Sequence, residues 1–296
     1  MINGLSVDVE EYFHPSELPS SSQPECWDLL PPRVPAQVDK VLELFARHQA
    51  KATFFILGWV AEHHPATVRR IVEAGHAIGC HSYAHRLVYD LSPDEFRADT
   101  LRATKAIEDA CGLRPLIYRA PSYSITARSL WALEILVECG FTHDSSIYPI
   151  SHDRCGIPGS GRHAQWVDTP AGPIYEIPIA TAKVFGQRAT PIGGGAYMRL
   201  LPYRYIAAGI RRMNNDESQP ACIYFHPWET DPRLPRLPAG RISQLRTYMG
   251  LRRMESKLER LLTEFQFSDL LSVCGASQKS QYCPGALRQS AVPSGI

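Results

Sequence analysis

The sequence predicts an α/β protein whose strands pair in parallel, folded as a barrel or a doubly wound sheet. Short apolar runs alternate along about the first 150 residues with segments that carry apolar side chains at helical spacing. Such alternation implies parallel pairing, because each helix returns the chain to the same edge of the sheet. Polar residues recur where the predicted strands end, which is where α/β folds place their chemistry.

The composition is ordinary for a soluble globular protein. The 296 residues are 44% apolar and 21% charged, and their number suits one large core or a core with an appendage. The formal net charge is +1 and the basic residues form no long block, so we expect no nucleic acid partner. The start lacks the basic and apolar regions of a signal peptide and no window is apolar enough to span a bilayer, so we expect a cytoplasmic protein.

The eight cysteines form no C-x-x-C pair, and most of them lie inside apolar runs. We interpret them as small buried side chains in a reducing compartment rather than as a disulfide framework.

The first predicted strand, residues 5–10, alternates apolar and polar side chains and places Asp8 and Glu10 on one face. Two neighbouring carboxylates at a strand end are costly unless a positive group lies beside them, which indicates a cation or an arginine. The alternative is a solvated edge strand, because carboxylates are mostly exposed.

The later elements follow in a regular order. Ser92, with Pro93 after it and Glu95 three residues on, marks a helix start, and Gly112 marks its end. We expect further helices at about 36–49, from 65, at 126–140, 202–213 and 240–265, and strands at about 52–57, 77–79, 116–118, 141–146, 174–178 and 221–225. Between about 150 and 200 the rhythm breaks, and the glycines at 193–195 predict a flexible loop that a ligand or backbone can approach closely. Residues 276–296, rich in Ser, Gln, Pro and Gly, predict a disordered tail.

His81 and His85 follow the predicted strand at 77–79. Two imidazoles four residues apart can bind one cation if the segment forms a helical turn, because positions i and i+4 share a face. The alternative is a polar loop in which each histidine caps a backbone group. Arg119, Asp144 and His226 follow other predicted strands, so acidic, basic and imidazole side chains recur at strand ends.

Taken together, these residues resemble the signature of the NodB-homology polysaccharide deacetylases, carbohydrate esterase family 4. The resemblance covers about residues 3–150 and 170–230, and it implies a distorted (β/α) barrel with a C-terminal extension, in one domain over residues 1–275. The segments that carry it, in the family's order and approximate spacing, are Thr53-Phe54-Phe55, His81-Ser82-x-x-His85, Arg119-x-Pro121, Asp144-x-Ser146 and Phe225-His226.

Three further segments resemble a bacterial subfamily found in exopolysaccharide loci with the PEP-CTERM/exosortase sorting system. They are Val-Asp-Val-Glu-Glu-Tyr-Phe at 7–13, the glycines before Arg199, and His-Pro-Trp-Glu at 226–229. That subfamily carries an extra C-terminal region, which corresponds here to about 150–275.

The resemblance implies a divalent metal site at Glu10, His81 and His85. The family usually takes its third ligand from an Asp directly after the catalytic base, but Val9 stands there in this chain. Members with a D-x-D strand use the residue two positions on, which corresponds to Glu10. The implied metal is zinc, with cobalt or another divalent ion as the alternative.

The resemblance also implies the catalytic residues. Asp8 is similar to the general base that activates water, and Arg119 to the residue that pairs with it. The backbone N–H of Ser122 matches the donor to the oxyanion. His226 is similar to the general acid, with Asp144 orienting it.

The implied activity is hydrolysis of N-acetyl groups on amino sugars of a polysaccharide or its lipid-linked precursor, in exopolysaccharide biosynthesis. An N-acetylated glycan is then the substrate, and a lipid-linked one implies peripheral association with a membrane. The first alternative is an allantoinase-like hydrolase of small-molecule C–N bonds. The second is a glycan-binding protein that keeps the fold but has lost turnover, against which the occupied proton-transfer positions argue.

Overall fold

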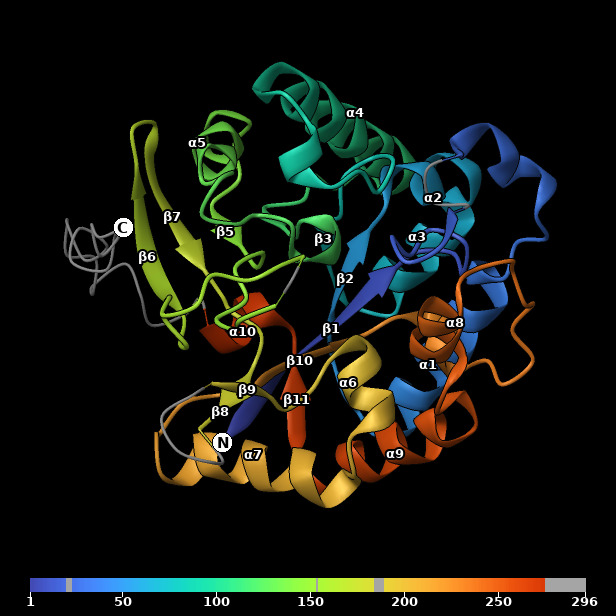
Figure 1. Ribbon diagram of the computed structural model, residues 1–296, viewed down its shortest axis with the longest axis vertical. Helices are drawn as coiled ribbons and strands as arrows, with labels where there is room; N and C mark the ends of the chain where they lie inside the picture. The colour runs from blue at the N-terminus through green and yellow to red at the C-terminus, as the bar shows by residue number, and fades with distance from the viewer. Residues whose placement is uncertain (20–22, 153, 184–188, 275–296) are drawn as a thin grey trace.

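A β-sheet that curls into a half-barrel forms the centre of the protein (Figure 1). The computed structural model describes residues 1–19, 23–152, 154–183 and 189–274. Within these ranges the sheet strands are β1 (Ile2–Val9), β2 (Thr53–Ile56), β3 (Ala77–Cys80), β4 (Ile117–Tyr118), β5 (His143–Asp144), β6 (Gln165–Thr169), β7 (Gly172–Glu176), β10 (Cys222–Phe225) and β11 (Gln266–Ser268). Their order is β10-β1-β2-β3-β4-β5-β7-β6, with β11 beside the start of β1. The predicted α/β class is confirmed, and the barrel is open.

Parallel pairing, predicted from the alternation of strands and helices, runs from β10 to β7. At the edge, β6 pairs antiparallel with β7 as a hairpin. A separate short pair joins β8 (Thr181–Ala182) and β9 (Thr190–Pro191). Val7 of β1 pairs with Phe225 of β10, so the next residues along the two chains, 8 and 226, lie side by side.

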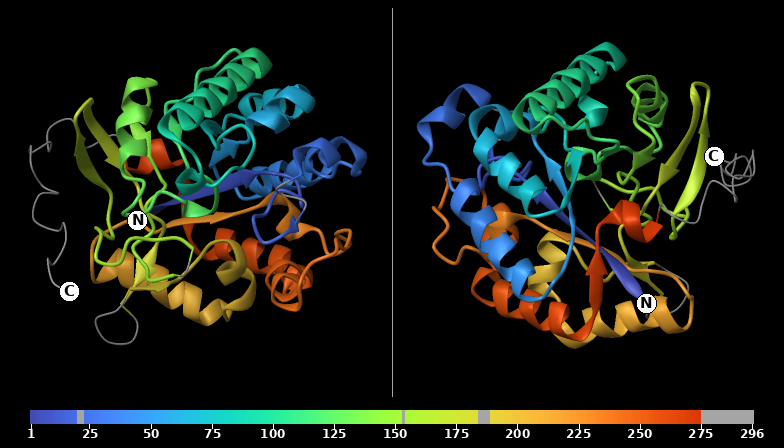
Figure 2. Two further views of the ribbon diagram at one scale, coloured as in Figure 1. Left: turned by 45° about the horizontal axis from the view of Figure 1, so that its top comes forward. Right: turned by 180° about the vertical axis from the view of Figure 1, so that it is seen from behind.

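Helices pack around the sheet. They are α1 (Val34–Arg47), α2 (Gly58–His63), α3 (Pro65–Glu73), α4 (Pro93–Cys111), α5 (Trp131–Glu138), α6 (Gly195–Leu200), α7 (Tyr203–Asn215), α8 (Arg241–Tyr248), α9 (Leu251–Glu264) and α10 (Leu270–Cys274). Successive side chains of β2 point to opposite faces of the sheet and pack in different hydrophobic cores. Phe54 packs in the larger core, whereas Phe55 packs with Leu270 of α10 on the other face. The view from behind shows α10 lying against that face (Figure 2). No helix in the described ranges is both long and apolar enough to cross a bilayer.

The expected start and stop signals of α4 are confirmed. The Ser92 hydroxyl accepts from the Glu95 N–H at 3.3 Å, and the Glu95 carboxylate accepts from the Ser92 N–H at 2.8 Å, which forms a capping box. Gly112 ends the helix with φ +74°, a conformation that a residue without Cβ adopts at little cost.

Other boundaries differ from the prediction. The expected helix at 240–265 is interrupted at Gly250, whose φ is +86°, because the chain there approaches the Arg199 carbonyl so closely that a Cβ would lie 2.9 Å from it. The helix expected from residue 126 begins only at Trp131. The glycine loop at 193–195 does pack tightly, since a Cβ on Gly194 would lie 2.0 Å from the Tyr224 ring, but Gly195 also opens α6.

No disulfide joins Cys26, Cys80, Cys111, Cys139, Cys222 or Cys274 in the described ranges. Cys80, Cys139, Cys222 and Cys274 are buried, and Cys26, Cys111 and Cys155 are half-buried. Cys283 and the expected disordered tail at 276–296 lie outside the described residues.

His76, directly before β3, should make the fold less stable in acid. The ring is 8% exposed, and its Nδ1 accepts from the Ala52 N–H at 3.3 Å. Burial, with the charge of Lys51, lowers the pKa of His76 from 6.5 to about 4. The unfolded ring therefore binds a proton at a higher pH than the folded ring, so the contribution of His76 to the free energy of unfolding is lost as the pH falls from 6.5 to 4.

Urea unfolding of wild type and His76→Gln at about pH 7.5 and about pH 4.5 measures this effect. Between about pH 7.5 and about pH 4.5 the free energy of unfolding should fall by about 2 kcal/mol more in the wild type than in the variant. Equal losses would show that protonation of His76 does not contribute.

Candidate active site

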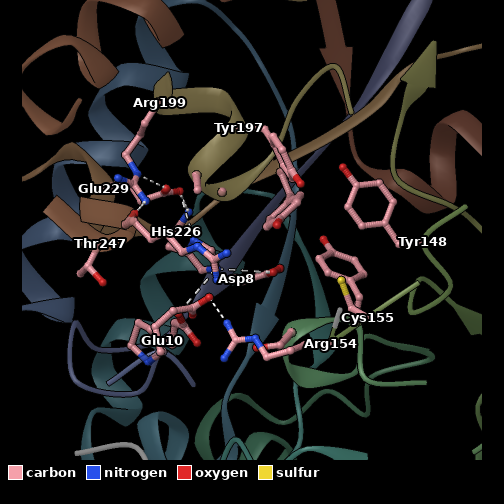
Figure 3. A pocket seen from close by; sticks show the side chains of 18 of the residues that line it. Asp8, Glu10, Tyr148, Arg154, Cys155, Tyr197, Arg199, His226, Glu229 and Thr247 are labelled. Atoms are coloured by element: carbon pink, nitrogen blue, oxygen red, sulfur yellow. Dashed lines mark hydrogen bonds and ion pairs between the residues drawn. The ribbon is translucent and has the colours of Figure 1, made fainter. Parts of the chain in front are cut away.

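A cavity of about 370 Å³ opens at the carboxyl ends of β1, β3 and β10 and the turn after β4 (Figure 3). The residues predicted from the sequence that line it are Asp8, Glu10, His81, His85, Ser122 and His226. Arg119 and Asp144 are fully buried and do not line the cavity. The position at the strand ends is where a parallel sheet exposes backbone and side chains to a ligand.

Glu10, His81 and His85 are the group in the described ranges that can hold a metal ion, with ligand atoms within 4.8 Å of one another. Nε2 of His85 lies 2.7 Å from a carboxylate oxygen of Glu10. Nδ1 of His81 donates to the Arg119 carbonyl at 2.8 Å, so Nε2 of the neutral ring carries no proton and can bind a cation. Burial lowers the pKa of His81 to about 4, which keeps the ring neutral. Two imidazoles and one carboxylate leave coordination positions open, as in catalytic rather than structural sites.

Glu10 is held as an anion inside the protein. Burial alone would raise the pKa of Glu10, but the imidazoles of His85 and His226 outweigh it and hold the pKa well below its usual range. The indole N–H of Trp228 donates to the carboxylate at 3.1 Å. Val9 points into the main hydrophobic core, so alternation along β1 leaves Glu10 on the same side as Asp8.

The segment from His81 to His85 is a loop, so the helical turn that would place both rings on one face does not form. Ser82 and His85 have φ of +62° and +54°, in the left-handed region that residues with a side chain seldom adopt. Asp99 of α4 holds the loop by accepting from the Tyr83 N–H at 2.8 Å. The two left-handed residues turn the chain back on itself, so both imidazoles reach one point without sharing a helix face.

Arg119 pairs with Asp8 from beneath the cavity. One guanidinium nitrogen donates to Oδ1 of Asp8 at 2.7 Å and to the Ser6 hydroxyl at 2.8 Å. The two charged side chains are 0% and 3% exposed, and the guanidinium lies 4.0 Å above the Phe55 ring. The second oxygen of Asp8 lies 4.0 Å from Nε2 of His226. Arg119 therefore fixes one oxygen of Asp8 and leaves the other available to a ligand.

His226 is the cationic imidazole of the cavity. Burial opposes its charge, but the carboxylates of Glu10, Glu229 and Asp8 outweigh burial and raise the pKa of His226 to about 9. Nδ1 donates to Glu229 at 3.1 Å, and the His226 N–H donates to the same oxygen at 2.9 Å. Arg199 of α6 in turn donates to Glu229 at 2.5 Å. Figure 3 shows Glu229 between Arg199 and His226.

Asp144 does not contact His226, so the expectation that it orients that ring is wrong. Its carboxylate accepts from the Ser146 hydroxyl at 2.6 Å and the Ser146 N–H at 3.1 Å. It pairs across the sheet with Glu176, and burial next to a second carboxyl group raises the pKa of Glu176 well above its usual range. Asp144 is thus engaged with Ser146 and Glu176, and Glu229 contacts His226 in its place.

Ser122 lies in a strained turn at the cavity wall. Ser122 and Tyr123 have φ of +51° and +54°. The Ser122 hydroxyl lies 2.9 Å from that of Ser16, and the Tyr123 ring packs against Tyr224 with centroids 5.1 Å apart. Consecutive residues in a sparsely populated conformation are typical of functional turns, because the surrounding structure must hold them.

The sequence did not single out Glu229 and Arg199 as site residues. A signal for Glu229 exists, since His226-Pro-Trp-Glu has the spacing of a capping box and Glu229 closes one here. Arg199 has no such signal, because only the tertiary structure brings α6 to the site. Other unpredicted residues of the wall include Tyr148, Arg154, Cys155, Tyr197 and Thr247.

Two family models together cover most of the chain. Residues 26–142 match "Polysaccharide deacetylase", and residues 145–274 match "Domain of unknown function (DUF3473)". His81 and His85 lie in the first segment and His226 and Glu229 in the second, whereas Asp8 and Glu10 precede both. The cavity therefore combines side chains from all three parts of the chain.

Curated relatives resemble the deacetylase part. The peptidoglycan-N-acetylglucosamine deacetylase of Bacillus cereus is 36% identical over 96 residues, which cover 32% of this chain and 35% of the relative. The chitooligosaccharide deacetylase of a Bradyrhizobium strain is 33% identical over 118 residues, which cover 40% of this chain and 53% of the relative. The matches thus span about a third to a half of the length of these two relatives.

A solved structure from Mycobacterium smegmatis, assigned to the polysaccharide deacetylases, has the same fold. It aligns with a TM-score of 0.57 and 19% identity, over 94% of this chain and 87% of that one. The buried group of Glu10, His81 and His85 fits the divalent metal site of this family. The chain therefore carries a polysaccharide deacetylase domain of carbohydrate esterase family 4, a family of carbon–nitrogen hydrolases, followed by a DUF3473 region.

Proposed function

We propose that the protein hydrolyses N-acetyl groups on the amino sugars of a glycan and releases acetate. The observation that carries the proposal is the meeting of three groups in one cavity. They are an open set of metal ligands, a carboxylate tied to a buried arginine, and an imidazole whose Nδ1 donates to the buried carboxylate of Glu229. Amide hydrolysis needs an electrophilic centre, a base and an acid, and each has a candidate here.

The residues divide the reaction between them. Glu10, His81 and His85 would hold a divalent cation, which would supply Lewis acidity towards the amide carbonyl and lower the pKa of water. The free oxygen of Asp8 takes the proton of the attacking water as the new C–O bond forms. The backbone N–H of Ser122 donates to the developing oxyanion. His226 gives its proton to the nitrogen as the C–N bond breaks, so a free amine and acetate leave.

We propose an exopolysaccharide or its lipid-linked precursor as the substrate, and a cytoplasmic location. The cavity wall supports a sugar ligand, because the aromatic side chains of Tyr123, Tyr148, Tyr224 and Trp228 line it and offer apolar faces beside polar groups. The names of the curated relatives point to N-acetylated sugars as well. The resemblance of residues 7–13 and 226–229 to the PEP-CTERM-associated subfamily supports the exopolysaccharide role.

Removing the carboxylate of Glu10 should remove both the metal and the activity. We expect wild type to hold about one divalent ion per chain, with zinc the first candidate and cobalt the second. Glu10→Ala should lose that ion and release acetate from N-acetylglucosamine oligomers at least about 10²-fold more slowly. Mass spectrometry of the bound metal, paired with the acetate assay, measures both.

Glu17→Gln is the matched control, because Glu17 lines the same cavity but pairs with Arg154 instead of joining the ligand group. This variant should keep the metal. A metal-free wild type that still releases acetate would contradict the proposed site and favour a metal-independent C–N hydrolase.

A further inference from the structure

The segment 232–254 contains six arginines and no acidic residue. They are Arg233, Arg236, Arg241, Arg246, Arg252 and Arg253. The whole chain has 31 basic side chains against 30 acidic ones, so the remainder of the chain is net negative. This segment therefore carries a local excess of positive charge, which the overall net charge conceals.

Five of these arginines point to solvent. Arg233, Arg236, Arg241, Arg252 and Arg253 are exposed. Among the described residues none of the five forms an ion pair, although most other arginines of the protein do. Their charge is thus available to a partner outside the chain.

Helix α8, which lies within this arginine-rich segment, also exposes large apolar side chains. Ile242 is 69% exposed and Leu245, three residues on, is 54% exposed, and Met249, four residues further on, is 43% exposed. Thr247, on the other side of α8, is buried and lines the active-site cavity. One side of this short helix therefore faces the active-site cavity, and the other presents large apolar side chains to solvent.

A second cavity, of about 530 Å³, brings three of the exposed arginines together with Met249. Arg236, Arg252, Arg253, Met249 and Leu200 line it, and its lining contains no acidic residue. Leu200 also lines the active-site cavity, so the two cavities adjoin. A site lined by guanidinium groups and no carboxylate suits a phosphate group.

We propose that this arginine face, formed by the five exposed arginines with Ile242, Leu245 and Met249, docks on a bilayer that contains anionic phospholipids. Arginines attract the headgroup phosphates, and the apolar side chains enter the boundary between headgroups and acyl chains. An acidic polysaccharide would use the arginines but would leave Ile242 and Leu245 exposed, so a lipid surface accounts for more of the face. Docking places the adjoining active site at the membrane surface, within reach of a glycan carried on a lipid.

Sedimentation with vesicles tests the docking independently of acetate release, so failure of the docking and failure of the deacetylase proposal are separately visible. Wild type should bind vesicles of phosphatidylcholine that contain phosphatidylglycerol and should bind pure phosphatidylcholine weakly. Arg252→Gln/Arg253→Gln should weaken binding by about fivefold per arginine removed, and the binding of wild type should fall in high salt. Ile242→Ser/Leu245→Ser should weaken it by at least about tenfold.

Leu113→Ser/Leu116→Ser is the matched control, because both leucines are exposed outside the arginine face. It should bind vesicles as wild type does. Both docking variants should also release acetate from soluble oligomers at the wild-type rate, which shows that they are folded. Absence of binding to the anionic vesicles, or equal binding by wild type and the docking variants, would overturn the proposal. So would a wild-type dimer that Ile242→Ser/Leu245→Ser dissociates without any vesicle binding, since a second copy would then cover the face.

Discussion

Asp8→Asn should lower kcat/KM for acetate release by at least about 10³-fold while the protein keeps its metal. An amide oxygen cannot take the proton of the attacking water. The ligand group itself is unchanged, because Glu10, His81 and His85 make it without Asp8. Steady-state kinetics on N-acetylglucosamine oligomers, together with metal analysis, measures the two effects.

The same substitution should destabilise the fold, because it leaves Arg119 buried without its counter-charge. Removing one partner of a buried ion pair costs about 3–5 kcal/mol. Ser6→Ala is the control: it removes the hydroxyl contact of the same guanidinium nitrogen but leaves the Asp8 carboxylate. The free energy of unfolding of this variant should fall by about 1 kcal/mol, and the variant should keep its activity. Activity that survives in a folded Asp8→Asn protein would contradict the assignment of Asp8 as the base.

His226→Gln should lower kcat by about 10²- to 10⁴-fold with little change in KM, because the variant cannot protonate the departing amine. Glu229→Gln should have a smaller effect, about 10- to 10²-fold, because the ring remains but loses the anion that orients it and holds its charge. Glu229 is thus a positioning residue for His226. The comparison is made on the same oligomers as the Asp8 test.

An ester with a good leaving group separates proton donation from a structural role. Aryl acetates release a phenolate that needs no proton, so both variants should cleave 4-nitrophenyl acetate at nearly the wild-type rate, whereas Asp8→Asn should not. Glu229→Asp should recover part of the amide activity, since it restores the negative charge. Equal losses on amide and ester would contradict the role of His226 as the acid.

The order of elements and most of the site residues follow from local sequence patterns. Alternation in β1 places Asp8 and Glu10 on one face, and this holds because successive side chains of a strand point to opposite sides whatever the strand pairs with. The capping box at Ser92 is equally local, because its two hydrogen bonds join residues three apart. The resemblance added the roles, which the patterns alone do not supply.

The partners of these residues depended on sheet order and on contacts between distant segments. Asp8 meets His226 because β1 pairs with β10, more than 200 residues away, and periodicity carries no information about which strands become neighbours. The loop at His81–His85 takes left-handed conformations because Asp99 of a later helix holds it.

Two wrong predictions have the same cause. Glu229, not Asp144, contacts His226, and the expected helix at 240–265 is broken between α8 and α9. Asp144 lies at the expected strand end, but it is buried beside Glu176. Glu229 reaches His226 because Arg199 donates to it. The chain between α8 and α9 must pass the Arg199 carbonyl, which only Gly250 allows. Local sequence thus determined which side chains stand at the strand ends, because strand and helix periods are properties of the backbone. Tertiary packing decided which of these side chains meet, because pairing, close approach and the compensation of buried charge depend on residues far apart in the chain.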